Sequence, residues 1–217
     1  MFQIVCLKNR LLFISFCIIL FSCKNRSIKL PYYNAPDFTP LFIQSENDVD
    51  RKITHTISNF SFVDQDSNEV SQKNVEGKIH LANFFFTSCG SICPVLMKNM
   101  HTISMAFTGD TNVVLLSYSV APWIDSVGKL RNYVITNNYE AANWHLLTGN
   151  KTTIYRLARQ SYFAEEETGF NSDSSNFLHT EHFILVDKNR RIRGIYNGTL
   201  ELETNQIIDD IKELEKE

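Results

Sequence analysis

Two cysteines separated by three residues are the side chains of this sequence with the clearest chemical potential. Cys89 and Cys93 follow an apolar run over residues 79–86 and come just before a helical pattern that opens with Pro94. Where a strand enters a helix, thiols at this spacing face the same way about one turn apart. They could close a disulfide or bind one soft metal ion together. The positive end of the helix is expected to lower the pKa of both thiols and to favour the thiolate.

The first residues of the chain have the pattern of an export signal. Lys8 and Arg10 precede an apolar stretch over residues 11–21, which has signal-peptide length and is short for a membrane span. The stretch ends in Leu-Phe-Ser-Cys, which resembles the lipobox of bacterial lipoproteins. We therefore expect residues 1–22 to be a lipoprotein signal peptide and Cys23 to carry the lipid. An uncleaved anchor or a buried apolar helix is the alternative.

Export would leave Cys89 and Cys93 as the two remaining thiols, in a compartment where disulfides persist. A bridge that closes so small a loop restrains the unfolded chain little, so stability is a poor reason for it. A redox couple or a metal clamp is the better interpretation. The formal net charge of −3 argues against a nucleic-acid partner, which would need clustered positive charge.

Apolar periodicity predicts one domain over residues 53–217, after a lipidated N-terminus and polar tether over residues 23–52. Buried strands are expected at residues 79–86 and 113–118, because these runs are almost continuously apolar. The other expected elements are a hairpin near residues 60–66, helices over 94–107, 125–134 (capped by Asp125), 151–160 and 207–214, a strand over 144–147, and a hairpin of 182–186 with 192–196.

This order of elements predicts an α/β fold with a parallel core and an antiparallel edge. A thioredoxin-like fold fits it, with an N-terminal β-hairpin extension, a C-terminal β-hairpin plus helix, and the cysteine pair at the start of the first core helix. The Ser-, Glu- and Asp-rich segment 161–177 is long for a loop in a compact domain, which makes it a candidate functional segment.

Several segments resemble signatures of the Sco (SenC) family. Residues 84–94 are similar to the family's F-F-x-T-x-C-x-x-x-C-P, and residues 144–149 are similar to its W-x-x-L-T-G. Residues 119–125 resemble S-V-D-P-x-x-D, although Ala121 stands where most of the family carries Asp. His179 stands eight residues before Asp187, as the family's ligand histidine stands before the aspartate that ends a strand.

The resemblance implies a thioredoxin-like, membrane-attached copper chaperone for cytochrome c oxidase assembly, although some relatives reduce thiols instead. It implies Cys89, Cys93 and His179 as ligands of Cu(I) or Cu(II), with the cysteines also serving as a redox pair. The implied partners are the oxidase subunit that carries the dinuclear copper site and a periplasmic thioredoxin-like reductant or copper donor. A lipid on Cys23 would hold the chain on a bacterial membrane, facing the periplasm of the cell envelope.

The donor set suits copper, because thiolate sulfur is soft and favours Cu(I) whereas imidazole accepts both oxidation states. His182 is the rival ligand, but the family spacing selects His179. Zinc would accept the same ligands with a water. Because Ala121 replaces the family's Asp, we expect an effect on copper transfer to a partner rather than on copper binding. Gly90 stands in place of the commoner Pro and leaves the loop between the cysteines freer.

Other candidates receive structural interpretations. Met97 and Met100 keep helical spacing and are expected in the core. The remaining histidines, His55, His80, His101 and His145, are expected on the surface or satisfied within the core. Two other functions stay open. A thiol–disulfide reductase would need the cysteine pair but not the histidine, and a peroxidase would want a polarising arginine, which is not found near the pair in the sequence.

Overall fold

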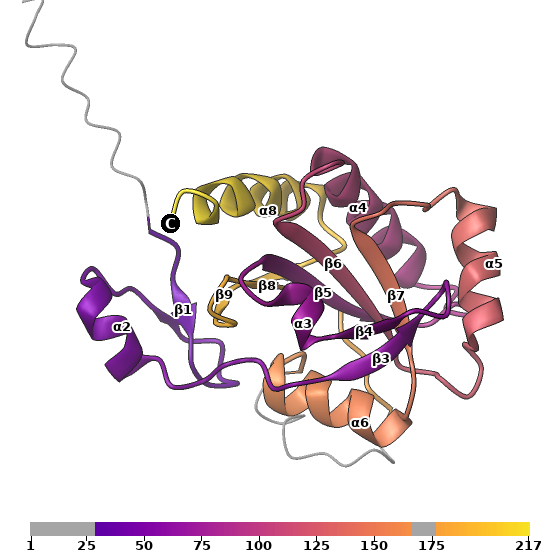
Figure 1. Cartoon of the computed structure of the whole chain (residues 1–217), viewed down its shortest axis with the longest axis horizontal. Helices are drawn as coiled ribbons and strands as arrows, with labels where there is room; N and C mark the ends of the chain where they lie inside the picture. Colours follow the sequence, from indigo (N-terminus) through magenta and orange to yellow (C-terminus); the bar gives the residue numbers. More distant parts are fainter. Residues whose placement is uncertain (1–28, 166–176) are drawn as a thin grey trace, which may run out of the picture.

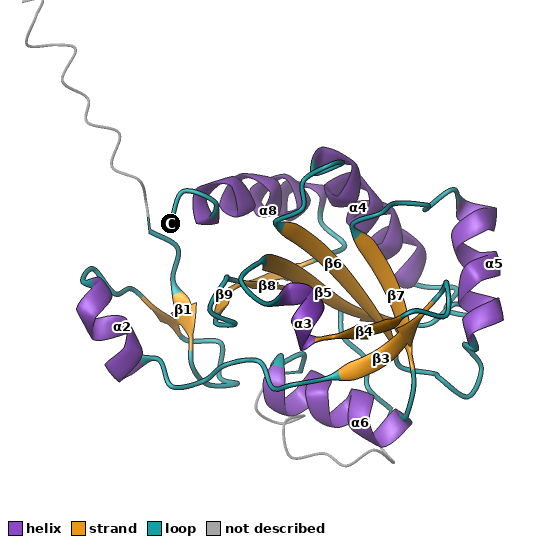
Figure 2. Cartoon of the chain, viewed as in Figure 1, coloured by secondary structure: helices purple, strands orange, loops and turns teal. Residues whose placement is uncertain are grey.

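The structure is a computed structural model, and it describes residues 29–165 and 177–217. The expected signal peptide, Cys23 and most of the segment 161–177 lie outside the described residues. Within the described ranges, the strands form one nine-stranded mixed sheet in the order β2-β1-β9-β8-β5-β6-β7-β3-β4, and helices pack on both faces (Figures 1 and 2).

The centre of the sheet is built from buried apolar strands. β5 (Ile79–Phe85) pairs in parallel with β6 (Val113–Ser119), and β6 pairs in parallel with β7 (Trp144–Thr148). Every residue of β5 and β6 is buried, as expected for strands covered on both faces. The two buried strands expected from the sequence are confirmed, and they are parallel neighbours in the sheet.

Antiparallel hairpins extend this core at both edges. β3 (Ser61–Asp64) and β4 (Glu69–Ser71) form the expected N-terminal hairpin, which joins the sheet beside β7. β8 (His182–Val186) pairs with β5 and forms the C-terminal hairpin with β9 (Ile192–Asn197). The thioredoxin-like α/β fold with both hairpin extensions is confirmed.

Helices cover the two faces of the sheet with separate cores (Figure 2). α4 (Cys93–Ala106), α5 (Val127–Asn137) and α8 (Glu201–Leu214) pack on one face. α3 (Gln72–Val75) and α6 (Lys151–Arg156) pack on the other. Met97 and Met100, which are part of α4, are fully buried, so their assignment to the core is confirmed.

Two helix ends differ from the expectation. The N-cap of α5 is Ser126, whose hydroxyl accepts a hydrogen bond from the Lys129 N–H, so the expected cap at Asp125 is wrong. Asp125 is instead buried and bonded to neighbouring loops. The helix expected over 151–160 is α-helical to Arg156 and then continues as the π-helix η1 (Leu157–Ser161).

Residues 29–52 are more structured than the expected polar tether. They contain β1 (Tyr32–Tyr33), β2 (Pro40–Leu41) and α2 (Glu46–Lys52), and β1 pairs with β9 (Figure 1). Too few apolar residues repeat here to give a periodic signal, but a small cluster still forms from Tyr32, Ile43, Val49 and Ile53. No helix in the described part of the chain is long and apolar enough to cross a bilayer.

Candidate metal and redox site

The two cysteines lie together where β5 delivers the chain into α4. Cys93 is the first residue of α4, with Pro94 beside it in the first turn, and Cys89 lies in the preceding loop. The two side chains are hydrogen-bonded to each other, and both thiols are free. Cys89 is partly exposed, whereas Cys93 is only 5% exposed. Sequence reasoning placed this pair correctly.

The environments of the two thiols separate their pKa values. Burial acts to raise the pKa of Cys89, but hydrogen bonds from the Cys93 thiol and from nearby backbone N–H groups lower it below its ordinary value. Burial, together with the hydrogen bond to Cys89, raises the pKa of Cys93 to about 12. The expectation that the helix start lowers both values is therefore wrong for Cys93, because desolvation outweighs the helix dipole there.

A buried carboxylate ties the cysteine loop to the loop that follows β6. Asp125 is 0% exposed and accepts hydrogen bonds from the Thr87 N–H at 3.1 Å and the Thr87 hydroxyl at 2.6 Å. It also accepts one from the Ser119 hydroxyl at 2.6 Å. Such charge-assisted bonds are short and strong, so Asp125 fixes the chain two residues before Cys89.

His179 lies with its side chain exposed between two buried residues, Leu178 and Thr180. Its backbone N–H donates to Glu165 at 3.4 Å. Its rival His182 is engaged elsewhere: the ring nitrogen Nδ1 lies 3.0 Å from the Ala164 carbonyl oxygen. Of the two, His179 has the ring with more freedom to take a ligand.

The structure brings the two sulfurs together, but it does not place His179 against them. Among residues 29–165 and 177–217, no three His, Cys, Asp or Glu side chains converge closely enough to hold a metal ion. The donor set nevertheless fits copper in its chemistry, since two adjacent soft sulfurs suit Cu(I) and the exposed imidazole can add a third donor. The assignment of His179 as a ligand stays a prediction.

The other histidines have partners within the fold. His55 contacts the Ser161 carbonyl at 2.7 Å, and His80 contacts the Tyr162 hydroxyl at 3.1 Å. His145 lies 3.1 Å from the Asp64 carboxylate, and His101 stacks near Trp144.

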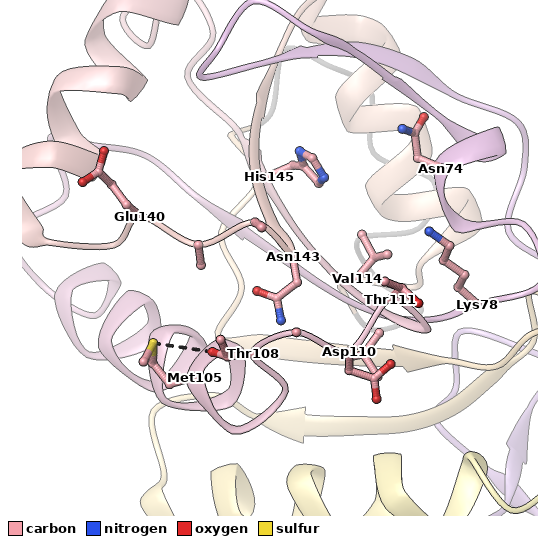
Figure 3. Close-up of a pocket in the computed structure, with 14 residues that line it drawn as sticks. Asn74, Lys78, Met105, Thr108, Asp110, Thr111, Val114, Glu140, Asn143 and His145 are labelled. Carbon is pink, nitrogen blue, oxygen red and sulfur yellow. Dashed lines mark hydrogen bonds between the residues drawn. The ribbon is translucent and has the colours of Figure 1, made fainter.

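A pocket of about 490 Å³ is shown in Figure 3, and neither cysteine lines it. It is lined by residues at the starts of the three parallel strands, including Lys78 before β5, Val114 in β6 and Asn143 before β7. The cysteines follow the carboxyl end of β5. The pocket therefore lies at the opposite, amino-terminal ends of the parallel strands.

Sequence reasoning missed three buried polar residues around the site: Asp125, Tyr155 and Arg159. Asp125 was interpreted as a helix cap, and the other two lie on a helix that gave no chemical signal.

A dithiol at the start of the first core helix of a thioredoxin-like fold defines a class of proteins that bind soft metals or exchange disulfides. The SCO1/SenC family model matches residues 49–216, and the chain belongs to this family.

Solved structures support the assignment. A SCO1/SenC family lipoprotein from Bacillus anthracis is 27% identical, with a TM-score of 0.64, covering 76% of this chain and 98% of that one. BsSco, a member of the Sco family of cytochrome c oxidase assembly proteins, is 28% identical with a TM-score of 0.62, covering 75% and 94%. Bradyrhizobium japonicum ScoI, solved with copper bound, shares the fold at 21% identity and a TM-score of 0.56, covering 72% and 98%.

Proposed function

We propose that this protein binds copper through Cys89, Cys93 and His179 in the cell envelope. It delivers the metal to a cytochrome c oxidase subunit during assembly, or reduces the cysteines of that subunit's dinuclear copper site. The observation that carries the proposal is the pair of free, hydrogen-bonded thiols at the start of α4 in a SCO1/SenC chain. The family's link to oxidase assembly and a relative solved with copper support it.

The three proposed ligands differ in their exposure to solvent, and this difference suits copper delivery. Cys93 is buried and holds the inner side of the site, whereas Cys89 is partly exposed and can meet an incoming ligand. His179 is exposed and can complete or release a third coordination position. Copper held by two sulfurs and one nitrogen leaves an open side, so a partner's thiolate can bind before the metal is released.

Copper binding is tested by anaerobic competition for Cu(I) between the reduced protein and a chelator. We expect about one Cu(I) per chain, and loss of binding in Cys89→Ala and in Cys93→Ala, because a single thiolate holds Cu(I) poorly. His179→Ala should weaken Cu(II) far more than Cu(I), and His182→Ala is the matched control that should change neither. A wild-type protein that reduces disulfides but cannot compete for Cu(I) would overturn the proposal.

A thiol–disulfide reductase of the cell envelope is the second candidate, favoured by the unequal pKa values of the two thiols. The thiolate of Cys89 would attack a partner disulfide, and Cys93 would then resolve the mixed disulfide as both cysteines become oxidised. For this function, His179→Ala leaves the reduction of insulin disulfides intact. Added copper would then fail to restore oxidase activity to cells that lack the protein, whereas recovery would favour delivery.

Lipid anchoring through Cys23 is the third part of the proposal, supported by the lipobox-like segment and by a relative described as a lipoprotein. Cys23→Ala should leave unprocessed precursor, detected by mass spectrometry and by detergent partitioning. Maturation of Cys23→Ala to the wild-type size would contradict the lipoprotein assignment.

A further inference from the structure

Three side chains near the carboxyl end of α6 connect the cysteine half of the proposed site to the histidine half. We propose that Tyr155, Arg159 and Glu165 are positioning residues that fix the backbone of Leu178 and His179 relative to the cysteine loop. This inference rests on the proposed copper function for its purpose. Its geometry stands on contacts within the described residues.

Tyr155 is the central connection. Its side chain is only 1% exposed, and its hydroxyl donates to the Val120 carbonyl at 2.9 Å. Burial raises the pKa of Tyr155, and a hydrogen bond from the Leu178 backbone opposes that rise. One buried hydroxyl therefore contacts both the loop after β6 and the residue that precedes His179.

The loop after β6 is in turn joined to the cysteine loop. The Val120 N–H donates to the Phe85 carbonyl at 2.9 Å, at the end of the strand that leads to the cysteines. The Asp125 N–H donates to the Ala121 carbonyl at 2.9 Å, and the Asp125 carboxylate accepts from Thr87. Hydrogen bonds thus run from the residues before Cys89, through Val120 and Tyr155, to Leu178.

A buried ion pair makes the second connection. Arg159 is 2% exposed, and its Nε donates to Glu165 Oε2 at 2.5 Å. The other carboxylate oxygen of Glu165 accepts from the His179 N–H. The Arg159 guanidinium also lies 5.2 Å from the centre of the Tyr155 ring, which couples the two connections.

The π-helix η1 gives Arg159 its place in this arrangement. A π turn inserts a residue into a helix and redirects the side chains that follow, and such turns are frequent at functional sites. Here the insertion lies between Tyr155 in α6 and Glu165. The buried Arg159 guanidinium lies within hydrogen-bonding distance of Glu165. Without this paired carboxylate, desolvation would make burial of the guanidinium charge unfavourable.

The contacts hold the backbone of His179, while its imidazole makes no hydrogen bond to a residue in 29–165 or 177–217. Leu178 is buried in the core on the α6 side of the sheet, and Thr180 is also buried. The exposed ring of His179 therefore projects from a fixed backbone. If His179 binds a metal, only rotation of its side chain is then needed to bring the imidazole to the ion. Hydrogen bonds to residues outside the coordination sphere commonly orient metal ligands in this way.

Tyr155→Phe, with Tyr162→Phe as the matched control, tests the inference in the full-length protein. Each change removes one hydroxyl from a buried tyrosine in the same core, but Tyr162 bonds to His80 and Tyr118 rather than toward His179. For Tyr155→Phe we expect Cu(II) affinity to fall about 10- to 100-fold, the range found for outer-shell partners, with Cu(I) affinity changed less than about threefold. The Cu(II) spectrum should change as well, and Tyr162→Phe should leave all three measurements as in wild type.

Glu165→Gln and Glu165→Ala refine the test. Gln keeps an oxygen that can accept from the His179 N–H, so it should retain more Cu(II) affinity than Ala. Unchanged Cu(II) affinity in Tyr155→Phe, or an equal loss in Tyr162→Phe, would overturn the inference.

Backbone amide exchange in the copper-free protein separates this inference from the proposed function. Tyr155→Phe should accelerate exchange at Leu178 and His179, whereas Tyr162→Phe should not. If the wild type binds no copper, the proposed function fails, but faster exchange in Tyr155→Phe still supports the positioning role. Unchanged exchange at both amides would reject it whether or not copper binds.

Discussion

Cys89 and Cys93 are four positions apart, yet they differ in exposure and in proton affinity. Cys93 loses its contact with water as the first residue of a packed helix, while Cys89 keeps that contact and gains hydrogen-bond donors. A dithiol with one accessible, more acidic sulfur and one buried, less acidic sulfur can open toward a partner from one side. This asymmetry suits stepwise exchange of a metal or of a disulfide.

Alkylation should reveal this asymmetry. We expect Cys89 of the reduced protein to react with iodoacetamide much faster than Cys93 at neutral pH, since only Cys89 has a lowered pKa. Its rate should fall as the pH drops below that pKa. Cys93→Ala removes a donor to Cys89 and should shift the profile to higher pH. Peptide mass spectrometry measures both sites, and equal labelling rates would contradict the prediction.

His80 is the second residue whose environment departs from the ordinary. Its ring is fully buried, and Nδ1 has no partner among the described residues. Burial, with a smaller contribution from the Arg190 charge, lowers its pKa to about 3. The folded state therefore keeps His80 neutral at pH values where the unfolded chain, with a pKa of about 6.5, binds a proton.

Stability should consequently fall on acidification. Above about pH 6.5, the buried neutral His80 makes its full contribution to the free energy of unfolding. As the pH falls from there toward the folded-state pKa, the free energy of unfolding decreases by up to ~1.4 kcal/mol per pH unit, because the unfolded chain binds a proton at His80 and the folded protein does not. His80→Leu should flatten the free energy of unfolding between pH 6 and pH 4, measured by urea denaturation. Tyr162→Phe keeps His80 buried and should retain the slope. A His80→Leu protein with the wild-type slope would contradict the assignment.

At the scale of elements, adjacent residues at the start of α5 serve two different structures. Ser126 caps the helix, while Asp125 bonds to Thr87 and Ser119 in other parts of the chain. Stability of the helix and geometry of the cysteine loop can therefore be changed separately.

Ser126→Ala should cost about 1 kcal/mol in the free energy of unfolding, the usual value of a lost N-cap, and should leave alkylation of Cys89 unchanged. Asp125→Asn removes a charged acceptor from a buried site and should cost about 2–3 kcal/mol. It should also alter the alkylation rate of Cys89, because the loop before that residue loses its anchor. Denaturation and labelling on the same samples check both. An effect of Ser126→Ala on Cys89 would contradict this division.

At the scale of the whole molecule, the segment before residue 53 completes the sheet edge. Arg193 in β9 is 1% exposed and donates to the carbonyl of Leu30 at 2.9 Å and to that of Pro31 at 3.1 Å. Its guanidinium lies 4.0 Å from the centre of the Tyr32 ring. The N-terminal segment thus covers both a strand edge and a buried charge.

A protein that starts at residue 54 should unfold at a lower denaturant concentration than the full chain, because Arg193 loses its carbonyl acceptors. It should also self-associate, since the edge of β9 becomes free to pair with another strand. Tyr32→Ala keeps the chain intact and should cost about 3 kcal/mol through the cavity it leaves. Size-exclusion chromatography and denaturation measure these effects. A monomeric truncated protein of unchanged stability would show that the segment is dispensable.

The sequence by itself determined the central strands, both hairpins and the place of the cysteine pair. These features depend on local information: continuous apolar runs mark β5 and β6, turn residues mark the hairpins, and a spacing of four joins Cys89 to Cys93 at a strand–helix junction. Family motifs added His179 as the predicted third ligand.

Only the tertiary structure decided the electrostatics and the supports of the site. The raised pKa of Cys93 follows from burial against distant parts of the chain. Asp125 accepts a hydrogen bond from Thr87 in the cysteine loop, 38 positions away in sequence. Glu165 accepts one from the His179 N–H, 14 positions away. The strand β1 gains its order by pairing with β9. Each of these properties depends on desolvation or on contacts between remote segments, which no local pattern of residues encodes.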